Sequence, residues 1–368
     1  MRVLLAGGGT GGHINPAIAV ANYITAREPD AEILFVGTKD GLEAELVPHS
    51  GYRIEMIKIH GFERHMPGQC IKSLCEIPGS IRASHKIIKR FRPDAVIGTG
   101  GYVAGPVLFA AAKRHIPTLV HESNAYPGIT TKILSGYVDT VALGFADAQK
   151  YLPKAKHIVV TGNPVRPSIL SVGEFEARRK LGLDARPFLV FVGGSLGARD
   201  FNRTAVDWIC ENAPSGKYQI LLSTGKLHHY DTVLQQFAAH QVDPMQLEGV
   251  KVCEYIYDMD LVLSAADLVI SRAGSGTLAE LTALDRASIL VPSPYVAENH
   301  QESNARTIER AGGARVILEK DFTPQRLNET IASLTADHAK LVEMKKAARK
   351  AGTAKAVDRI FDEMTKLL

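Results

Sequence analysis

Residues 187–206 read PFLVFVGGSLGARDFNRTAV. An apolar run meets a cluster of glycines, and a stretch with helical spacing follows. The first twenty residues, MRVLLAGGGTGGHINPAIAV, have the same order. A strand, a glycine turn and a helix begin a Rossmann-like βαβ unit, so the sequence predicts two such domains.

Short apolar runs alternate with longer amphipathic stretches outward from both glycine turns. This alternation is typical of α/β proteins, in which helices cover both faces of a parallel sheet. Besides the strand of 187–206, the predicted strands are 3–6, 33–36, 53–57, 95–97, 118–120, 140–142 and 157–160 in the first half and 219–222, 251–253, 268–270, 288–291 and 315–318 in the second.

The segment TGNPVRPSIL (161–170) lies between the two series and contains two prolines. Each proline disfavours helix and lacks a backbone donor, so we interpret this segment as a hinge. The expected domains are an N-terminal domain at 1–162 and a C-terminal domain at 163–353. The last helix, about 354–368, could belong to either of them.

Composition excludes several classes of protein. Of 368 residues, 45% are hydrophobic and 22% charged, and the net charge of +4 does not indicate a nucleic-acid-binding protein. The four cysteines form no C-x-x-C pair, so we expect a reducing cytoplasm and no zinc site. We expect no secretory signal, and no stretch is long and apolar enough to span a bilayer.

The first glycine turn, Gly7 to Gly12, matches the G-x-G-x-x-G pattern of dinucleotide-binding proteins. However, the second strand ends in Gly37-Thr38, where a dehydrogenase needs an acid for the ribose. A third glycine turn, RAGSGTLAEL (272–281), follows the strand at 268–270. We therefore expect a nucleotide in the C-terminal domain and another anionic ligand in the N-terminal domain.

Several motifs carry a family resemblance over nearly the whole chain. They are GGTGGH (8–13), GGYVAGP (100–106), HESNAYPG (121–128), GNPVR (162–166), GGSLGA (193–198), SRAGSGTLAE (271–280) and NHQESNA (299–305). In order and spacing the chain resembles the MurG family, the UDP-N-acetylglucosamine transferases of peptidoglycan synthesis.

This resemblance implies a GT-B fold, in which two Rossmann-like domains face each other across a cleft. It implies inverting transfer of N-acetylglucosamine from UDP-N-acetylglucosamine to the 4-hydroxyl of the N-acetylmuramyl unit of lipid I, which gives lipid II. The activity belongs to cell-wall synthesis, and hence to cell shape and division. No cofactor is implied.

The resemblance also implies roles for individual residues. Ser195 would meet the diphosphate, Glu280 the ribose, and Arg166 with the backbone of Ile256 the uracil. The sugar would be surrounded by Asn124, Ser275, Gly276, His300 and Gln301. Positions Thr10, Gly11 and Gly12 also match the family's donor contacts, and Tyr102, His121, Glu122 and Asn202 fall at other positions important in the family.

His13 follows the last glycine of the first turn, where a helix begins. We predict that it is the catalytic base, kept neutral by the positive end of that helix. Alternatively, it only bonds the loop backbone or the donor phosphates, and Glu122 or His121 becomes the next candidate base. His121 and Glu122 could equally form a base with its orienting carboxylate or simply build the wall of the cleft.

Three further signals have simpler interpretations. Asp258-Met259-Asp260 is a D-x-D triplet, but it precedes a helical stretch, so Asp258 is expected as an N-cap rather than a metal ligand. We predict no metal. Arg272 is expected to anchor its own loop rather than to bind phosphate, and Trp208 is expected in the core.

The segment QCIKSLCEIPGSIRASHKIIKRFR (69–92) is basic and amphipathic. Ile71, Leu74, Ile77 and Ile81 fall at helical spacing, although Pro78-Gly79 should interrupt the helix. Such a stretch can pack as an ordinary surface helix or lie on an anionic membrane. Because the implied acceptor is tethered to a polyprenyl chain, we favour peripheral binding at the cytoplasmic face of the cell membrane.

Two other functions remain open at this point. One is another GT-B enzyme that uses a UDP-sugar, such as a glycolipid glycosyltransferase or a UDP-N-acetylglucosamine epimerase. An epimerase should need neither HESNAYPG nor the basic segment. The other is a nucleotide-binding regulatory module without turnover, which an assay for UDP and a disaccharide would distinguish.

Overall fold

The computed structural model describes residues 1–61, 67–227 and 229–368, with the backbone alone for 67–72. The chain divides into two compact units. Unit 1 comprises Met1–Val165 and Ala354–Leu368, and unit 2 comprises Arg166–Thr353. The division falls inside the segment interpreted as a hinge, three residues after position 162, and the last helix groups with unit 1.

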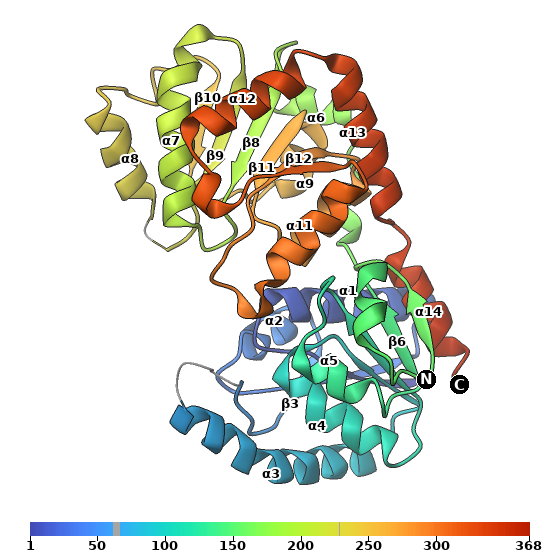
Figure 1. Cartoon of the computed structure of the whole chain (residues 1–368). Helices are drawn as coiled ribbons and strands as arrows, with labels where there is room; N and C mark the ends of the chain where they lie inside the picture. Colours follow the sequence, from blue (N-terminus) through green and yellow to red (C-terminus); the bar gives the residue numbers. More distant parts are fainter. Residues whose placement is uncertain (62–66, 228) are drawn as a thin grey trace. The chain divides into compact units, whose positions relative to one another are not determined.

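Unit 1 contains a seven-stranded parallel sheet of order β3-β2-β1-β4-β5-β6-β7 (Figure 1). Its strands are β1 (Arg2–Ala6), β2 (Glu32–Gly37), β3 (Arg53–Met56), β4 (Ala95–Gly98), β5 (Thr118–Glu122), β6 (Thr140–Leu143) and β7 (Ile158–Val160). Its helices are α1 (Gly11–Arg27), α2 (Glu43–His49), α3 (Pro67–Phe91), α4 (Gly101–Ala112), α5 (Ile129–Leu134) and α14 (Ala356–Thr365), with a 3₁₀ turn η1 (Ala146–Tyr151).

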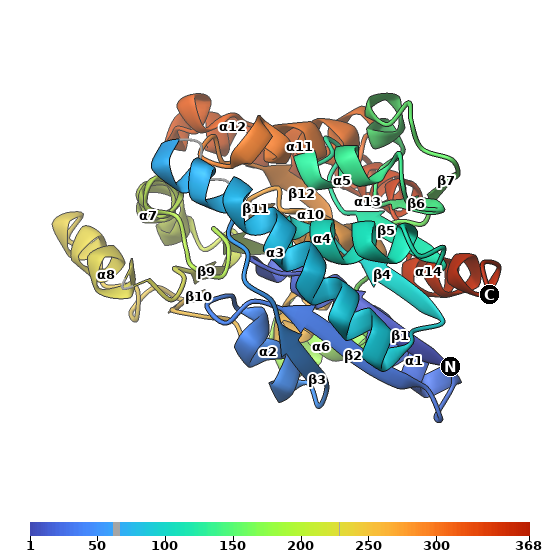
Figure 2. The ribbon, with the colours of Figure 1, turned by 90° about the horizontal axis from the view of Figure 1, so that it is seen from below.

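The centre of this sheet is fully buried. Val3 to Ala6 of β1 have no exposed surface, since helices cover both faces and every position needs an apolar residue. On one face α3 and α4 pack side by side, as Figure 2 shows. On the other face α1 packs against α14, whose Val357, Ile360 and Met364 complete that core cluster.

Unit 2 repeats the design with a six-stranded parallel sheet of order β10-β9-β8-β11-β12-β13. Its strands are β8 (Phe188–Val192), β9 (Gln219–Ser223), β10 (Val250–Cys253), β11 (Leu268–Ser271), β12 (Ala287–Leu290) and β13 (Ala314–Val316). Its helices are α6 (Glu174–Lys180), α7 (Arg199–Asn212), α8 (His229–Ala239), α9 (Met259–Ala265), α10 (Ser275–Ala283), α11 (His300–Arg310), α12 (Pro324–Thr335) and α13 (His338–Ala351), with 3₁₀ turns η2 (Pro167–Leu170), η3 (Ala213–Ser215), η4 (Ala297–Asn299) and η5 (Glu319–Asp321).

Both sheets have a topological switch point between strands that are neighbours in space but not in sequence. In unit 1 it lies between β1 and β4, and in unit 2 between β8 and β11. Open α/β sheets bind ligands outside the carboxyl ends of the strands at such a point. All three glycine turns singled out in the sequence follow one of these four strands.

The predicted break at Pro78-Gly79 is wrong, because α3 continues from Pro67 to Phe91. Proline removes one donor to the carbonyl four residues earlier, here Leu74. Leu74, Pro78 and Gly79 are all exposed, so water can satisfy that carbonyl. On the next turn the Ser80 hydroxyl donates to the Ile77 carbonyl at 2.8 Å.

The apolar stripe of α3 mostly faces the protein. Ile77 and Ile81 are partly buried, and Ile87 and Ile88 belong to the core beneath. Leu74 instead is 56% exposed, and the Ile71 side chain lies outside the described residues. No helix in the described part of the chain is both long and apolar enough to cross a membrane.

Candidate functional site

The first glycine turn connects β1 to α1 and packs against the turn after β4. Thr10 occupies the N-cap position of α1 with extended backbone angles. The amides of Gly11 and Gly12 lie in the first turn of the helix and have no intrahelical acceptors. A Cβ on Gly101 would stand 2.3 Å from the Gly8 carbonyl oxygen. The two turns meet this closely only because glycine occupies both.

His13 lies in the first turn of α1 and is partly exposed. Its Nδ1 is 3.2 Å from the Gly8 carbonyl oxygen and 3.3 Å from Thr10 Oγ1. A carbonyl oxygen only accepts, so Nδ1 of the neutral ring donates and the lone pair is at Nε2. The His13 ring packs on the turn after β4, because a Cβ on Gly100 would be 2.8 Å from the ring's Cδ2.

Glu43, the first residue of α2, is a site residue that the sequence analysis did not find. Its carboxylate has no exposed surface. Oε2 accepts a hydrogen bond from the Gly9 amide at 3.0 Å, and Oε1 accepts from the Thr38 amide at 3.0 Å and the Thr38 hydroxyl at 2.7 Å. The negatively charged Glu43 carboxylate therefore braces the backbone of the first glycine turn. Its charge disfavours the binding of a pyrophosphate at that turn.

Three glycines make room for this carboxylate. A Cβ on Gly8 or Gly41 would approach Glu43 Oε1 to 2.5 and 2.3 Å, and one on Gly37 would approach its Cγ to 2.5 Å. The feature of the sequence that could have indicated this buried carboxylate is the pair Gly37 and Gly41, which lie at and just after the end of a strand and shortly before Glu43. Its meaning depends on β1 and β2 being neighbours, which only the fold shows.

His121 and Glu122 end β5, and both are buried. Burial lowers the pKa of His121, although its hydrogen bond to the Gly162 carbonyl opposes this. The neutral ring fits, with Nε2 donating to Gly162 O at 3.1 Å and Nδ1 accepting from Ser123 Oγ at 3.4 Å. A fully buried ring cannot reach a substrate.

Glu122 organises the loop that follows it. Oε1 accepts from the Asn124 amide at 2.9 Å and the Asn124 side chain at 3.3 Å, and Oε2 accepts from the Gly128 amide at 3.1 Å. Asn124 is only partly buried. Of the two interpretations of Glu122, the geometry favours the wall of the site over a base.

Tyr102 lies at the start of α4, partly buried, over the first glycine turn. A Cβ on Gly9 would be 2.9 Å from its ring. Its hydroxyl is 3.5 Å from Thr38 Oγ1. In unit 1 the fold thus gathers Thr10, Gly11, Gly12, His13 and Tyr102 at the switch point, with Glu43 behind them.

The second glycine turn connects β8 to α7 and exposes Ser195. Gly194 and Gly197 have φ of 103° and 84°, the left-handed region that favours glycine. The Ser195 carbonyl accepts from the Lys226 amide at 3.1 Å. Ile256, in the loop after β10, is buried.

The third glycine turn opens α10 at Ser275, with Gly274 as its N-cap. Gln301 ties this turn to the next loop, because its Oε1 accepts from the Ala273 amide at 3.3 Å and the Ser293 amide at 2.9 Å. Its Nε2 has no hydrogen-bond partner among the described residues and can donate to a ligand. Gly276 is exposed at the helix start, and His300 begins α11 with Nδ1 2.7 Å from the Ala297 carbonyl oxygen.

Arg166 and Glu280, predicted to contact different parts of the nucleoside, pair with each other. The Arg166 Nη2 and Nε atoms lie 2.9 and 3.2 Å from Glu280 Oε1. The arginine side chain is 52% exposed and the glutamate 19%. One oxygen of Glu280 receives both bonds, so its other oxygen is not used in this pair.

The remaining predicted residues have mainly structural positions. Arg272 is buried in an ion pair with Glu319 and also bonds the Val291 carbonyl, as expected for a loop anchor. Trp208 is fully buried. Asp258 occupies the N-cap of α9, but its side chain makes no capping bond. Among the described side chains, no group of acids, histidines and cysteines is placed to hold a metal.

Asn202 lies in α7 rather than in a glycine turn, and it is 2% exposed. Its Nδ2 donates to the Thr224 carbonyl at 2.8 Å. In unit 2, therefore, Ser195, Ser275 and Gly276 occupy turns at the switch point. Arg166, Glu280, His300, Gln301 and Ile256 lie on elements beside or beyond them.

Two parallel sheets, each with a glycine-turn site at its switch point, define the class of nucleotide-sugar enzymes with the GT-B fold. Residues 3–143 match the glycosyltransferase family 28 N-terminal domain, and residues 188–360 match the glycosyltransferase family 28 C-terminal domain. The chain belongs to this family.

Individual relatives are similar over nearly the full length. The chain is 46% identical over 363 residues to the UDP-N-acetylglucosamine–N-acetylmuramyl-(pentapeptide) pyrophosphoryl-undecaprenol N-acetylglucosamine transferase of Acetivibrio thermocellus, covering 98% of this chain and 97% of the relative. It is 47% identical over 362 residues to the enzyme of that name from Caldanaerobacter subterraneus, covering 98% of each. The crystal structure of Acinetobacter baumannii MurG matches with a TM-score of 0.80, 27% identity and 99% coverage of both chains.

Proposed function

We propose that this chain transfers N-acetylglucosamine from UDP-N-acetylglucosamine to the 4-hydroxyl of the N-acetylmuramyl unit of lipid I, with inversion, to give lipid II. The observation that carries this proposal is the near-full-length similarity to transferases named for that reaction. The chain is a glycosyltransferase of peptidoglycan synthesis.

The donor's diphosphate binds at the two glycine turns of unit 2. Both turns open helices, α7 and α10, whose first amides point out of the helix with partial positive charge. Ser195 adds an exposed hydroxyl. These groups stabilise the negative charge that develops on UDP as it leaves, and this stabilisation needs no metal.

The nucleoside and sugar bind around these turns. Glu280 accepts hydrogen bonds from the ribose hydroxyls, and Arg166 together with the Ile256 backbone contacts the uracil. The ion pair between Arg166 and Glu280 supports this assignment, because each side chain positions the charged group of the other before the donor binds. Gln301 donates Nε2 to the sugar while its oxygen braces two loops, and Ser275, Gly276 and His300 supply further contacts.

His13 removes the proton from the attacking hydroxyl through Nε2. The Gly8 carbonyl supports this role because it fixes the proton of the neutral ring on Nδ1. Thr10, Gly11 and Gly12 contact the substrate at the start of the same helix, α1. Glu122 and His121 act by positioning, since both are buried and bonded to neighbouring backbone or side chains.

Peripheral attachment to the cytoplasmic face of the cell membrane occurs through the exposed side of α3. This side carries the exposed basic residues Arg82, Lys86 and Lys89. The exposed apolar side chain of Leu74 lies nearer the other end of the helix. Each basic residue near an anionic surface contributes about 1 kcal/mol. Because Ile77, Ile81, Ile87 and Ile88 face the protein, attachment is mainly electrostatic and sensitive to salt.

Vesicle sedimentation tests the attachment. Changing Arg82, Lys86 and Lys89 to Glu should release the protein from anionic vesicles while sparing turnover of a short-chain soluble acceptor. The matched control reverses three exposed basic residues outside α3, namely Lys39, Arg114 and Lys154. If the control is released equally, attachment reflects overall charge and not this helix.

The reaction itself is tested with UDP-N-acetylglucosamine and a lipid I analogue. Release of UDP together with a disaccharide linked to the lipid is the expected result. Formation of UDP and a free epimerised sugar without acceptor would instead point to an epimerase. Binding without any product would point to a regulatory module.

A further inference from the structure

The loop that follows β9 lies between two segments of the donor site proposed above. In the sheet of unit 2, β9 is the neighbour of both β8 and β10. Its last residue, Ser223, is in register with Val192 of β8 and Cys253 of β10. Because the carboxyl ends of parallel strands share one edge of the sheet, the loop lies between the turn of Ser195 and the loop of Ile256. The proposed site places the diphosphate at the first and the uracil at the second.

The backbone of Lys226, in this loop, is fixed against the second glycine turn. Its amide donates to the Ser195 carbonyl at 3.1 Å. The preceding residue, Gly225, has a φ of 87°, and a Cβ on it would be 2.1 Å from the Gly197 nitrogen, so the loop and the turn meet backbone to backbone. The Gly225 amide also donates to the Glu254 carbonyl at 2.8 Å. Both neighbouring segments therefore hold the base of the lysine side chain.

The Lys226 side chain extends over two tyrosines that flank Ile256. Its Nζ is 4.1 Å from the centroid of the Tyr255 ring and 5.7 Å from that of the Tyr257 ring. The two rings are in edge contact, with centroids 5.0 Å apart. An aromatic face attracts an ammonium group without neutralising it, so the charge and the N–H donors remain available to an anion.

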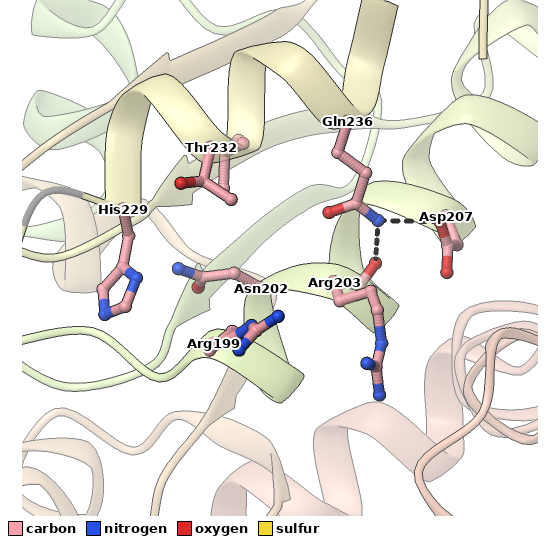
Figure 3. Close-up of a pocket in the computed structure, with 8 residues that line it drawn as sticks. Arg199, Asn202, Arg203, Asp207, His229, Thr232 and Gln236 are labelled. Atoms are coloured by element: carbon pink, nitrogen blue, oxygen red, sulfur yellow. Dashed lines mark hydrogen bonds between the residues drawn. The ribbon is translucent and has the colours of Figure 1, made fainter. Parts of the chain in front are cut away.

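Lys226 is exposed and makes no ion pair with an acid among the described residues. In contrast, Arg166 and Arg272, beside the third glycine turn, are both paired with glutamates. Arg199 begins α7 and lines a cavity between α7 and α8 (Figure 3). Lys226 therefore brings an available positive charge to the edge of the Ser195 turn.

We propose that Lys226 binds the diphosphate of the donor and stabilises the charge that develops on UDP as it leaves. This role deepens the proposed donor site at the Ser195 turn and rests on it. The ends of α7 and α10 supply partial charges there, whereas an ammonium group supplies a full one. Tyr255 and Tyr257 restrain the flexible lysine stem before the donor binds, so less side-chain entropy is lost on binding.

A matched control lies at the opposite end of the same strand. Lys217 precedes β9, and its Nζ is 5.1 Å from the centroid of the Tyr218 ring. Like Lys226 it is exposed and makes no ion pair among the described residues. Ligands of open parallel sheets bind at the carboxyl ends of the strands, so Lys217 shares the aromatic contact of Lys226 but not its position.

The test uses the full-length protein. Lys226→Met keeps an apolar stem on the rings and removes the charge, and Lys226→Arg keeps the charge. The controls are Lys217→Met and Arg199→Met, which remove a charge at the other end of β9 and at the start of α7. UDP binding is measured by calorimetry at constant ionic strength, and uridine binding by displacement of UDP. Melting temperatures report whether each variant is folded.

We expect Lys226→Met to weaken UDP binding by about tenfold and to leave uridine within about twofold of the parent, while Lys226→Arg and both controls stay within about threefold. An unchanged UDP affinity in Lys226→Met would overturn the proposal. Equal losses for UDP and uridine would mean that the lysine only shapes the uracil loop, and an equal loss in Arg199→Met would assign the effect to the general positive potential. Either result would also overturn it. If the parent does not bind UDP, the proposed donor site itself fails.

Stabilisation of the leaving group has a separate readout. The single-turnover rate with a lipid I analogue at saturating donor should fall by about tenfold in Lys226→Met and recover in Lys226→Arg, because the charge on UDP increases in the transition state. If UDP binding weakens but this rate is unchanged, Lys226 binds the donor and its transition state equally, and its role in the departure of UDP is wrong.

Discussion

The glycine turns after β1 and after β8 have the same local design but opposite electrostatic settings. Behind the first lies the buried Glu43 carboxylate, bonded to the Gly9 amide. The second is braced by neutral groups, with the Lys226 amide bonded to the Ser195 carbonyl and the Thr224 carbonyl packed on Gly197. A backbone shaped for phosphate is therefore not enough to identify a phosphate site.

This difference assigns separate tasks to the two turns. An anion next to a buried carboxylate loses part of the attraction of the helix end, whereas the second turn keeps it. The second turn therefore suits the donor diphosphate. The first turn suits a reacting hydroxyl and a base, because the His13 ring lies there with its Nδ1 held by the Gly8 carbonyl and the lone pair at Nε2.

The largest effect should come from His13. His13→Ala should lower kcat by about 10²- to 10⁴-fold, since general-base help is of that size, with little change in UDP affinity. His13→Gln keeps a hydrogen-bonding group without a usable base and should be nearly as slow. Steady-state kinetics with a lipid I analogue measures both, and near-parent turnover by His13→Gln would leave His13 only a structural role.

A smaller effect is expected in unit 2. Glu280→Ala should raise KM for the donor by about 10- to 100-fold, because a ribose would lose its acceptor and Arg166 its partner. Glu280→Gln keeps the shape and one acceptor and should lose less. An unchanged donor KM in folded Glu280→Ala would place the ribose elsewhere.

His121 should affect stability rather than rate. Its pKa is lowered by burial, so the unfolded chain binds more protons than the folded one as the pH falls below about 6.5. Folding is then penalised at acid pH, and the penalty disappears above that value. Denaturant titrations should show that His121→Gln loses less stability than the parent between pH 7 and pH 5. Parallel pH profiles would contradict this.

The smallest effect is expected from metal removal. If helix N-termini stabilise the departing UDP, EDTA should change turnover by less than about twofold. Activity that collapses in EDTA and returns with magnesium or manganese would restore Asp258 and Asp260 as metal ligands.

Most of the fold could be predicted because its signals are local. Apolar runs such as Val3 to Ala6, followed by glycines, indicate buried parallel strands, and the strands lie within two residues of their predicted positions. The continuous α3 could not be predicted, because whether Pro78 breaks a helix depends on which side of it faces water.

The site was only partly predictable, for a related reason. His13, Ser195 and Ser275 lie in glycine turns and could be found from them. Glu43 could not be found, because its burial depends on Gly8 of the first glycine turn and the pair Gly37 and Gly41 meeting around one carboxylate. The pairing of Arg166 with Glu280, far apart in sequence, likewise appears only when the chain is folded.

The most direct test of the division of tasks is the Glu43→Gln variant. A carboxamide can still accept from Thr38 through its oxygen, but it turns an NH₂ toward the Gly9 amide, so the first turn loses its brace. UDP affinity, measured by calorimetry, should stay within about twofold of the parent, while kcat falls by about tenfold or more, as expected for the loss of one charged hydrogen bond. A changed UDP affinity with kcat preserved would mean that the first turn holds the donor diphosphate, and would contradict the account.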